Sequence, residues 1–127
     1  MLAATAQAPG LARQATHEAL AAWRVAHLEE TAVLLVSELV TNAIRYTDGP
    51  VTLRLVLERA LTCEVADTSP TPPRMRHTAR DDESGRGLQV VSQLSLRWGT
   101  RRTAGGKVVW CEQQLPRGFT PALPPRT

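Results

Sequence analysis

Residues 51–67 read VTLRLVLERALTCEVAD and contain two runs in which apolar and polar side chains alternate. Alternation over residues 51–57, and again over 61–66, is typical of β-strands with one buried face. The three-residue connection between them predicts an antiparallel pair. The apolar members expected to face the core are Val51, Leu53, Leu55, Leu57, Leu61, Cys63 and Val65. This pair is the centre from which the fold is predicted.

Two amphipathic helices are predicted before the pair. Apolar residues recur at three- and four-residue steps from Leu11 to His27, and the same period continues from Glu29 to Tyr46. The apolar face expected for the first helix is Leu11, Ala15, Ala19, Ala22, Trp23 and Ala26. The turn sequence Asp48-Gly49-Pro50 stops the second helix.

After the pair, residues 68–84 are polar, contain three prolines and show no periodicity. A structureless loop of this length inside a domain is usually functional. A short helix over 88–94 and two strands, 96–100 and 107–115, follow it. The element order predicts an α/β (α+β) protein: a two-layer sandwich of a mixed, mainly antiparallel sheet with helices on one face.

The 127 residues predict one domain, over 11–115, between a loose end at 1–10 and a Pro-rich tail at 116–127. No apolar run approaches the roughly 20 residues that cross a bilayer. The first nine residues have neither a basic start nor a long apolar stretch, so we expect no signal peptide and a cytoplasmic protein.

Charge and composition disfavour several kinds of site. The net charge is +3, and the basic residues are scattered, so nucleic-acid binding has little support. The three histidines lack metal-ligand spacing, which disfavours zinc. Cys63 and Cys111 lie in apolar strand-like runs and are expected to be buried free thiols.

One face of the second predicted helix is polar. A helical wheel places Thr31, Glu38, Asn42 and Arg45 in a stripe opposite the apolar arc. Glu38 and Asn42 are four residues apart and therefore neighbours. Leu34 and Leu35 flank the stripe, so it is either a solvated face or the side of a pocket.

Two further features can carry chemistry. Asp67 ends a predicted strand, where an aspartate either forms a turn or points into a pocket and accepts from an amine. The sequence Gly85-Arg86-Gly87-Leu88 precedes the last predicted helix, so its amides could approach a phosphate, although Gly-x-Gly is also common in turns.

In combination these features resemble the GHKL ATPase superfamily, with its Bergerat-type fold, and more closely its small anti-sigma-factor serine kinases. Residues 37–43, SELVTNA, are similar to that branch's N box. Asp67-Thr68-Ser69 with Pro72-Pro73-Arg74 resembles the first nucleotide box, and residues 85–88 resemble the second. Two segments of this chain are similar to that branch's closing strands: Arg97-Trp98-Gly99 and Gly106-Lys107-Val108-Val109-Trp110.

The resemblance implies an ATP-dependent serine/threonine protein kinase with Mg²⁺. Asn42 would coordinate Mg²⁺, Glu38 would be the general base, and Asp67 would accept from the adenine amine. The amides of Gly85 and Gly87 would meet the phosphates. Residues 68–84 would form a lid, with Arg74 or Arg86 on a phosphate. Arg45 and Leu88 complete the nucleotide-binding set.

The implied partners are an anti-sigma-factor antagonist, phosphorylated on serine, or a sigma factor, or both. Kinases of this type are often homodimers, so the resemblance also implies a second copy of the chain. Ser69 and Thr71 stand where the superfamily has glycines, and Val108 stands where it often has threonine. These departures favour the alternative of a non-catalytic regulator that captures a sigma factor or antagonist. A third hypothesis, phosphorylation of His17, rests on the faint motif Thr16-His17-Glu18.

Overall fold

A computed structural model describes residues 1–45, 47, 49–69 and 83–115, without the side chains of 83–88. The helices are α1 (Ala8–Ala22), α2 (Glu29–Arg45) and α3 (Glu83–Leu94), with a 3-10 turn, η1 (Ala26–Leu28), between the first two. The strands are β1 (Thr52–Leu57), β2 (Ala60–Asp67), β3 (Arg97–Thr103) and β4 (Gly106–Gln114).

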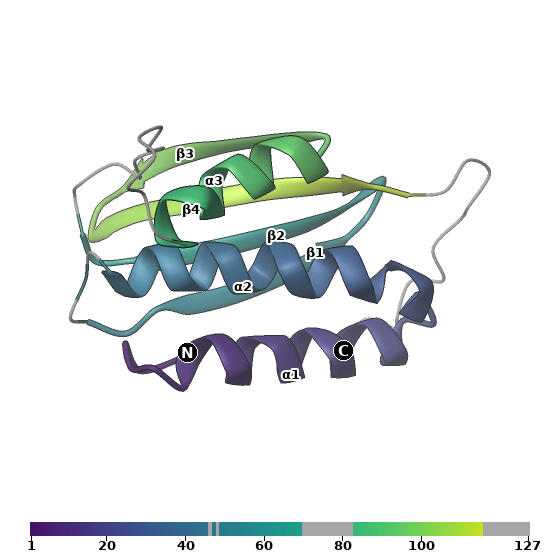
Figure 1. Cartoon of the computed structure of the whole chain (residues 1–127), viewed down its shortest axis with the longest axis horizontal. Helices are drawn as coiled ribbons and strands as arrows, with labels where there is room; N and C mark the ends of the chain where they lie inside the picture. The colour runs from purple at the N-terminus through teal and green to yellow at the C-terminus, as the bar shows by residue number, and fades with distance from the viewer. Residues whose placement is uncertain (46, 48, 70–82, 116–127) are drawn as a thin grey trace.

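The four strands form one sheet in the order β1-β2-β4-β3, and its three strand pairings are all antiparallel. All three helices lie on the same side of this sheet (Figure 1). The alternation of side chains along β2 determines which face of the sheet the helices cover. The buried residues of this strand are Leu61, Cys63, Val65 and Asp67, whereas the residues between them are only partly buried. The predicted α+β sandwich is therefore confirmed.

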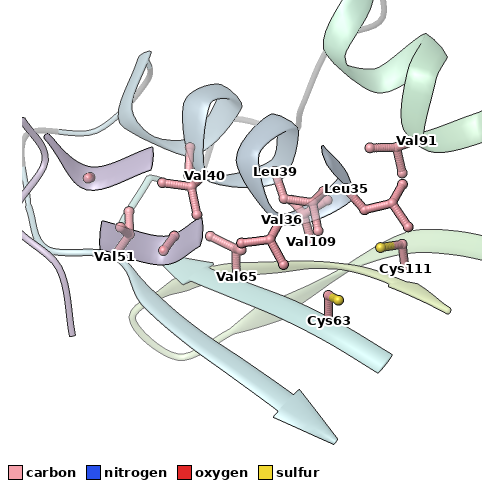
Figure 2. Packing of buried hydrophobic residues seen from close by; sticks show 13 residues of the cluster. Leu35, Val36, Leu39, Val40, Val51, Cys63, Val65, Val91, Val109 and Cys111 are labelled. Carbon is pink, nitrogen blue, oxygen red and sulfur yellow. The ribbon is translucent and has the colours of Figure 1, made fainter. Parts of the chain in front are cut away.

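The main core lies between α2 and the sheet. Leu35, Val36 and Leu39 of α2 pack over Val65 and Val109, and Val91 of α3 lies beside Leu35 (Figure 2). Leu35 was expected to flank a polar stripe, but it is fully buried because α3 covers that side of α2. Leu34, its neighbour, is largely exposed.

The buried face of α1 differs from the expected one. Leu11 is 56% exposed, and the buried residues are Ala8, Ala12, Thr16 and Leu20. Two alanines let α1 lie close against α2, and the Thr16 hydroxyl donates to the Ala12 carbonyl at 2.8 Å, so its burial leaves no donor unpaired. In an Ala-rich helix, apolar period alone does not select the face.

The N-terminal end is tied to the sheet. Leu2 and Val51 exchange two backbone hydrogen bonds, of 2.6 and 2.8 Å, and α1 begins at Ala8. The expectation of a loose end at 1–10 therefore needs correcting, since an isolated bridge is invisible to periodicity. The tail at 116–127 lies outside the described residues.

Candidate functional site

The polar stripe of α2 lies on the side of the helix next to α3. Leu35 and Leu39 are helical neighbours of Glu38 and Asn42, and both leucines share a cluster with Val91 of α3. Asn42 is only 5% exposed, which is unusual for an amide on a solvated face. Glu38 is half-buried and Arg45 is exposed. The stripe is therefore covered along the part that carries Glu38 and Asn42. At Arg45 it lies on the protein surface.

Asp67 lies at the same end of the layer as Asn42. The register pairs Thr52 with Ala66, so Val51 lies beside Asp67. Val40 of α2 lies over Val51 in Figure 2, and Asn42 follows Val40 by two residues. The tertiary structure thus brings to one end of the sheet an amide and a carboxylate that are 25 positions apart in the sequence.

The Asp67 carboxylate forms a turn and an ion pair. Its Oδ1 accepts from the backbone N–H of Ser69 at 2.8 Å and from Lys107 Nζ at 3.0 Å. Lys107 Nζ is also 3.0 Å from Oδ2. The side chains of Asp67 and Lys107 are 0% and 3% exposed. The turn-former interpretation of Asp67 is therefore confirmed, and the side chain is buried, whereas acceptance of an amine stays a prediction.

Sequence reasoning missed Lys107, and a signal for it was present. Lys107, Val109 and Cys111 alternate along β4, so a strand that buries Val109 and Cys111 must also turn Lys107 inward. Lys107 is also the only lysine in a chain whose other basic residues are arginines. The next residue, Val108, to which the family resemblance draws attention, lies on the opposite face of β4.

Close backbone approach fixes the surroundings of Asp67. A Cβ on Gly106 would lie 2.0 Å from the Asp67 carbonyl oxygen, so only glycine lets the β3–β4 hairpin meet the end of β2. On the other side, Thr47 Oγ1 lies 2.8 Å from Thr68 Oγ1, and the Gly49 N–H donates to Thr47. The chain before β1 and the start of β4 thus hold the end of β2 between them.

The glycine segment lies inside a helix, where a preceding loop was expected. Helix α3 begins at Glu83, so Gly85 and Gly87 belong to its first two turns. The first four amides of a helix lack intrahelical acceptors. Those of Gly85 and Arg86 are therefore available to an anion, whereas Gly87 is one position too late. Glycine near a helix start is tolerated because its full destabilisation relative to alanine applies only in the helix interior.

Several predicted site residues remain outside this description. Arg74 lies among residues 70–82, which the structure does not describe, as does most of the expected lid at 68–84. For Arg86 and Leu88 only the helical backbone is described. Their roles stay predictions.

Comparison with known proteins decides the family. The model of the histidine kinase-like ATPase domain matches residues 2–112. The chain belongs to this family. The match begins at Leu2, in agreement with the bridge from Leu2 to Val51. No curated protein matches the chain.

Membership of the histidine kinase-like ATPase family confirms the GHKL resemblance and implies ATP binding. The described residues fit a nucleotide in one respect. Asp67 Oδ2 is buried and accepts no hydrogen bond from any described residue, so it retains capacity for an amine donor. Asn42 offers an amide oxygen of the kind that Mg²⁺ accepts. Within the described part of the chain, no helix is both long and apolar enough to cross a membrane.

A hollow of about 270 Å³ among the described residues meets Asp67, Thr68, Thr103 and Gly105. The Asp67 side chain is buried, so its carboxylate is not exposed in this hollow. Another hollow, of about 390 Å³, lies by the β1–β2 turn and the start of β3.

Proposed function

We propose that this ATPase domain is an anti-sigma-factor-type serine protein kinase, which transfers the γ-phosphate of ATP to a serine of an antagonist protein. The family supports ATP binding. The proposal of a protein substrate rests on the small single-domain pattern and the N box at residues 37–43. The observation that carries it is that the buried Asn42 and Asp67 lie at the same end of the helix–sheet layer, with Glu38 one helical turn before Asn42.

The residues would divide the work by position. Magnesium-bound ATP supplies the transferable phosphoryl group. Asn42 would hold the metal ion, and Asp67 would accept from the base. The amides of Gly85 and Arg86 would contact phosphate oxygens at the positive end of α3. Glu38, one helical turn before Asn42, would take the proton from the attacking serine hydroxyl. Phosphoryl transfer depends mainly on such positioning and charge neutralisation.

The test is transfer of labelled γ-phosphate from ATP to purified antagonist proteins, with wild type and Glu38→Gln compared. Loss of a general base is expected to slow transfer by about 10²–10⁴-fold. ATP affinity should change little. Glu30→Gln is the matched control, since Glu30 is exposed in the first turn of the same helix. Equal transfer by wild type and Glu38→Gln would remove the base assignment.

A second candidate is a regulator that binds a sigma factor or antagonist without transferring phosphate. The Asp67–Lys107 ion pair favours it, because the carboxylate expected to read adenine is already occupied. Co-purification of a sigma factor with the domain, at equal yield with and without ATP and with no labelled product, would support it. Light scattering on the same sample tests the expected homodimer.

A further inference from the structure

The Asp67–Lys107 pair is built into the sheet. The two residues are directly opposed on β2 and β4, both on the face towards the helices. The ammonium group is 3.0 Å from each carboxylate oxygen, and almost none of either side chain reaches solvent. An ion pair inside a low-dielectric layer is held more strongly than one in water. It is therefore a resident feature of the protein and not a surface contact.

The backbone leaves the pair no room to separate by sliding. Gly106, the residue before Lys107, lies against the carbonyl of Asp67 so closely that an added Cβ would be 2.0 Å away. Asp67 is also fixed from the other side by the N–H of Ser69. A lysine that leaves the carboxylate must therefore do so by rotating its side chain, because the two strand ends are held against each other.

The balance of donors favours the lysine over a neutral amine. Oδ1 already accepts two hydrogen bonds, and Oδ2 is the oxygen with capacity left. A base amine that reaches Oδ2 must either displace the ammonium or share the carboxylate with it. Both donors would bond to a charged acceptor, but the ammonium also brings a full positive charge, whose attraction to the carboxylate is strong inside a low-dielectric layer. The amine therefore gains little from Asp67 while Lys107 is present.

We propose that Lys107 sets the base selectivity of this domain by occupying Asp67, so that the amine of adenine contributes little to nucleotide affinity. The proposal rests on the proposed nucleotide site at Asp67. Lys107 acts here as a specificity-determining residue. Replacing it with a short neutral side chain frees the carboxylate and makes the site discriminate.

The experiment measures the affinity of two ligands by calorimetry: ATP, and purine riboside triphosphate, which lacks only the 6-amine. For wild type the two dissociation constants should agree within about threefold. For Lys107→Thr, ATP should bind about tenfold or more tightly than the analogue, the amount that a hydrogen bond to a charged group contributes. Lys107→Arg keeps a cation beside Asp67 and should behave as wild type does.

Gln114→Thr, at an exposed position of the same strand, is the matched control and should leave the ratio unchanged. Circular dichroism first establishes that each variant is folded. If Lys107→Thr does not fold, the proposal is still tested by the ratio of the two dissociation constants in the wild type and in Lys107→Arg. A wild type that prefers ATP tenfold over the analogue overturns the proposal, as does a folded Lys107→Thr whose ratio stays near one.

The outcomes separate this proposal from the proposed function. Equal binding of both ligands by wild type, with discrimination by Lys107→Thr but no phosphate transfer, supports the role of Lys107 and removes the kinase. Phosphate transfer by a wild type that discriminates strongly supports the kinase and removes the role of Lys107. Absence of triphosphate binding in all variants removes both.

Discussion

Two cross-strand residue pairs on β2 and β4 differ in chemistry according to where they lie along the strands. Cys63 faces Cys111 and Asp67 faces Lys107 across β2 and β4, with Val65 and Val109 between them. All four side chains point towards the helices and are buried. The cysteines lie in the core with Leu35 and Val91 (Figure 2). The charged pair lies where β2 ends and β4 begins.

Burial is compatible with the two pairs for different reasons. A hydrogen bond with Cys111, burial and the electrostatic effect of Cys111 raise the pKa of the Cys63 thiol well above its usual value, so this thiol keeps its proton. Asp67 and Lys107 instead form a buried ion pair. One backbone frame thus holds two thiols where apolar side chains surround them and an ion pair beside the proposed site.

Removing the charge of Lys107 should cause the largest loss of stability. In Lys107→Met the side chain keeps its length, but Asp67 is left buried without its cation. The free energy of unfolding is expected to fall by about 3–5 kcal/mol, as when one partner of a buried pair is removed. Urea denaturation measures the loss.

The double variant Asp67→Asn with Lys107→Met is the control for that prediction. It removes both charges and retains an acceptor for the Ser69 N–H, so it should recover most of the lost stability. Failure of the double variant to recover would mean that Lys107 contributes through packing and not through its charge.

The cysteine pair should respond to pH instead. Because the pKa of Cys63 is raised in the folded protein, the native state holds a proton that the unfolded state has released above about pH 8.5. Stability should therefore be unaffected at neutral pH and fall at alkaline pH, by up to about 1.4 kcal/mol for each pH unit.

Urea midpoints between pH 7 and 10 test this slope. Cys63→Ala should be less stable at every pH but should lose the contribution of this thiol to the slope. If the alkaline slope of Cys63→Ala matches that of wild type, other groups cause it and the comparison of the two pairs fails.

The smallest effect is expected for an ion pair on the open face of the sheet. Arg54 and Glu64 lie 3.6 Å apart, and the Arg54 side chain is 69% exposed. Exposed pairs contribute about 0–1 kcal/mol. Arg54→Ala should thus shift the urea midpoint only slightly, and high salt should remove the difference. A loss as large as that of Lys107→Met would contradict the importance given to burial.

Much of the fold was predictable because it follows from local periodicity. The alternation at 51–57 and 61–66 correctly placed β1 and β2, and the helical period placed α2 within one residue. The start of α3 was not predictable in this way, because glycines are common just before a helix, whereas α3 begins at Glu83, before Gly85. The face of α1 was also wrong, because alanine packs as well on either side of a helix.

The sequence by itself determined the sheet, the α2 stripe with Glu38 and Asn42, and the family resemblance, since each depends on the order and spacing of neighbouring residues. Only the tertiary structure decided that Lys107 meets Asp67, because the two lie 40 positions apart and their contact depends on the register of β2 with β4. Spacing along a chain fixes the faces of helices and strands, whereas the partner of a buried charge is fixed by which strands pair.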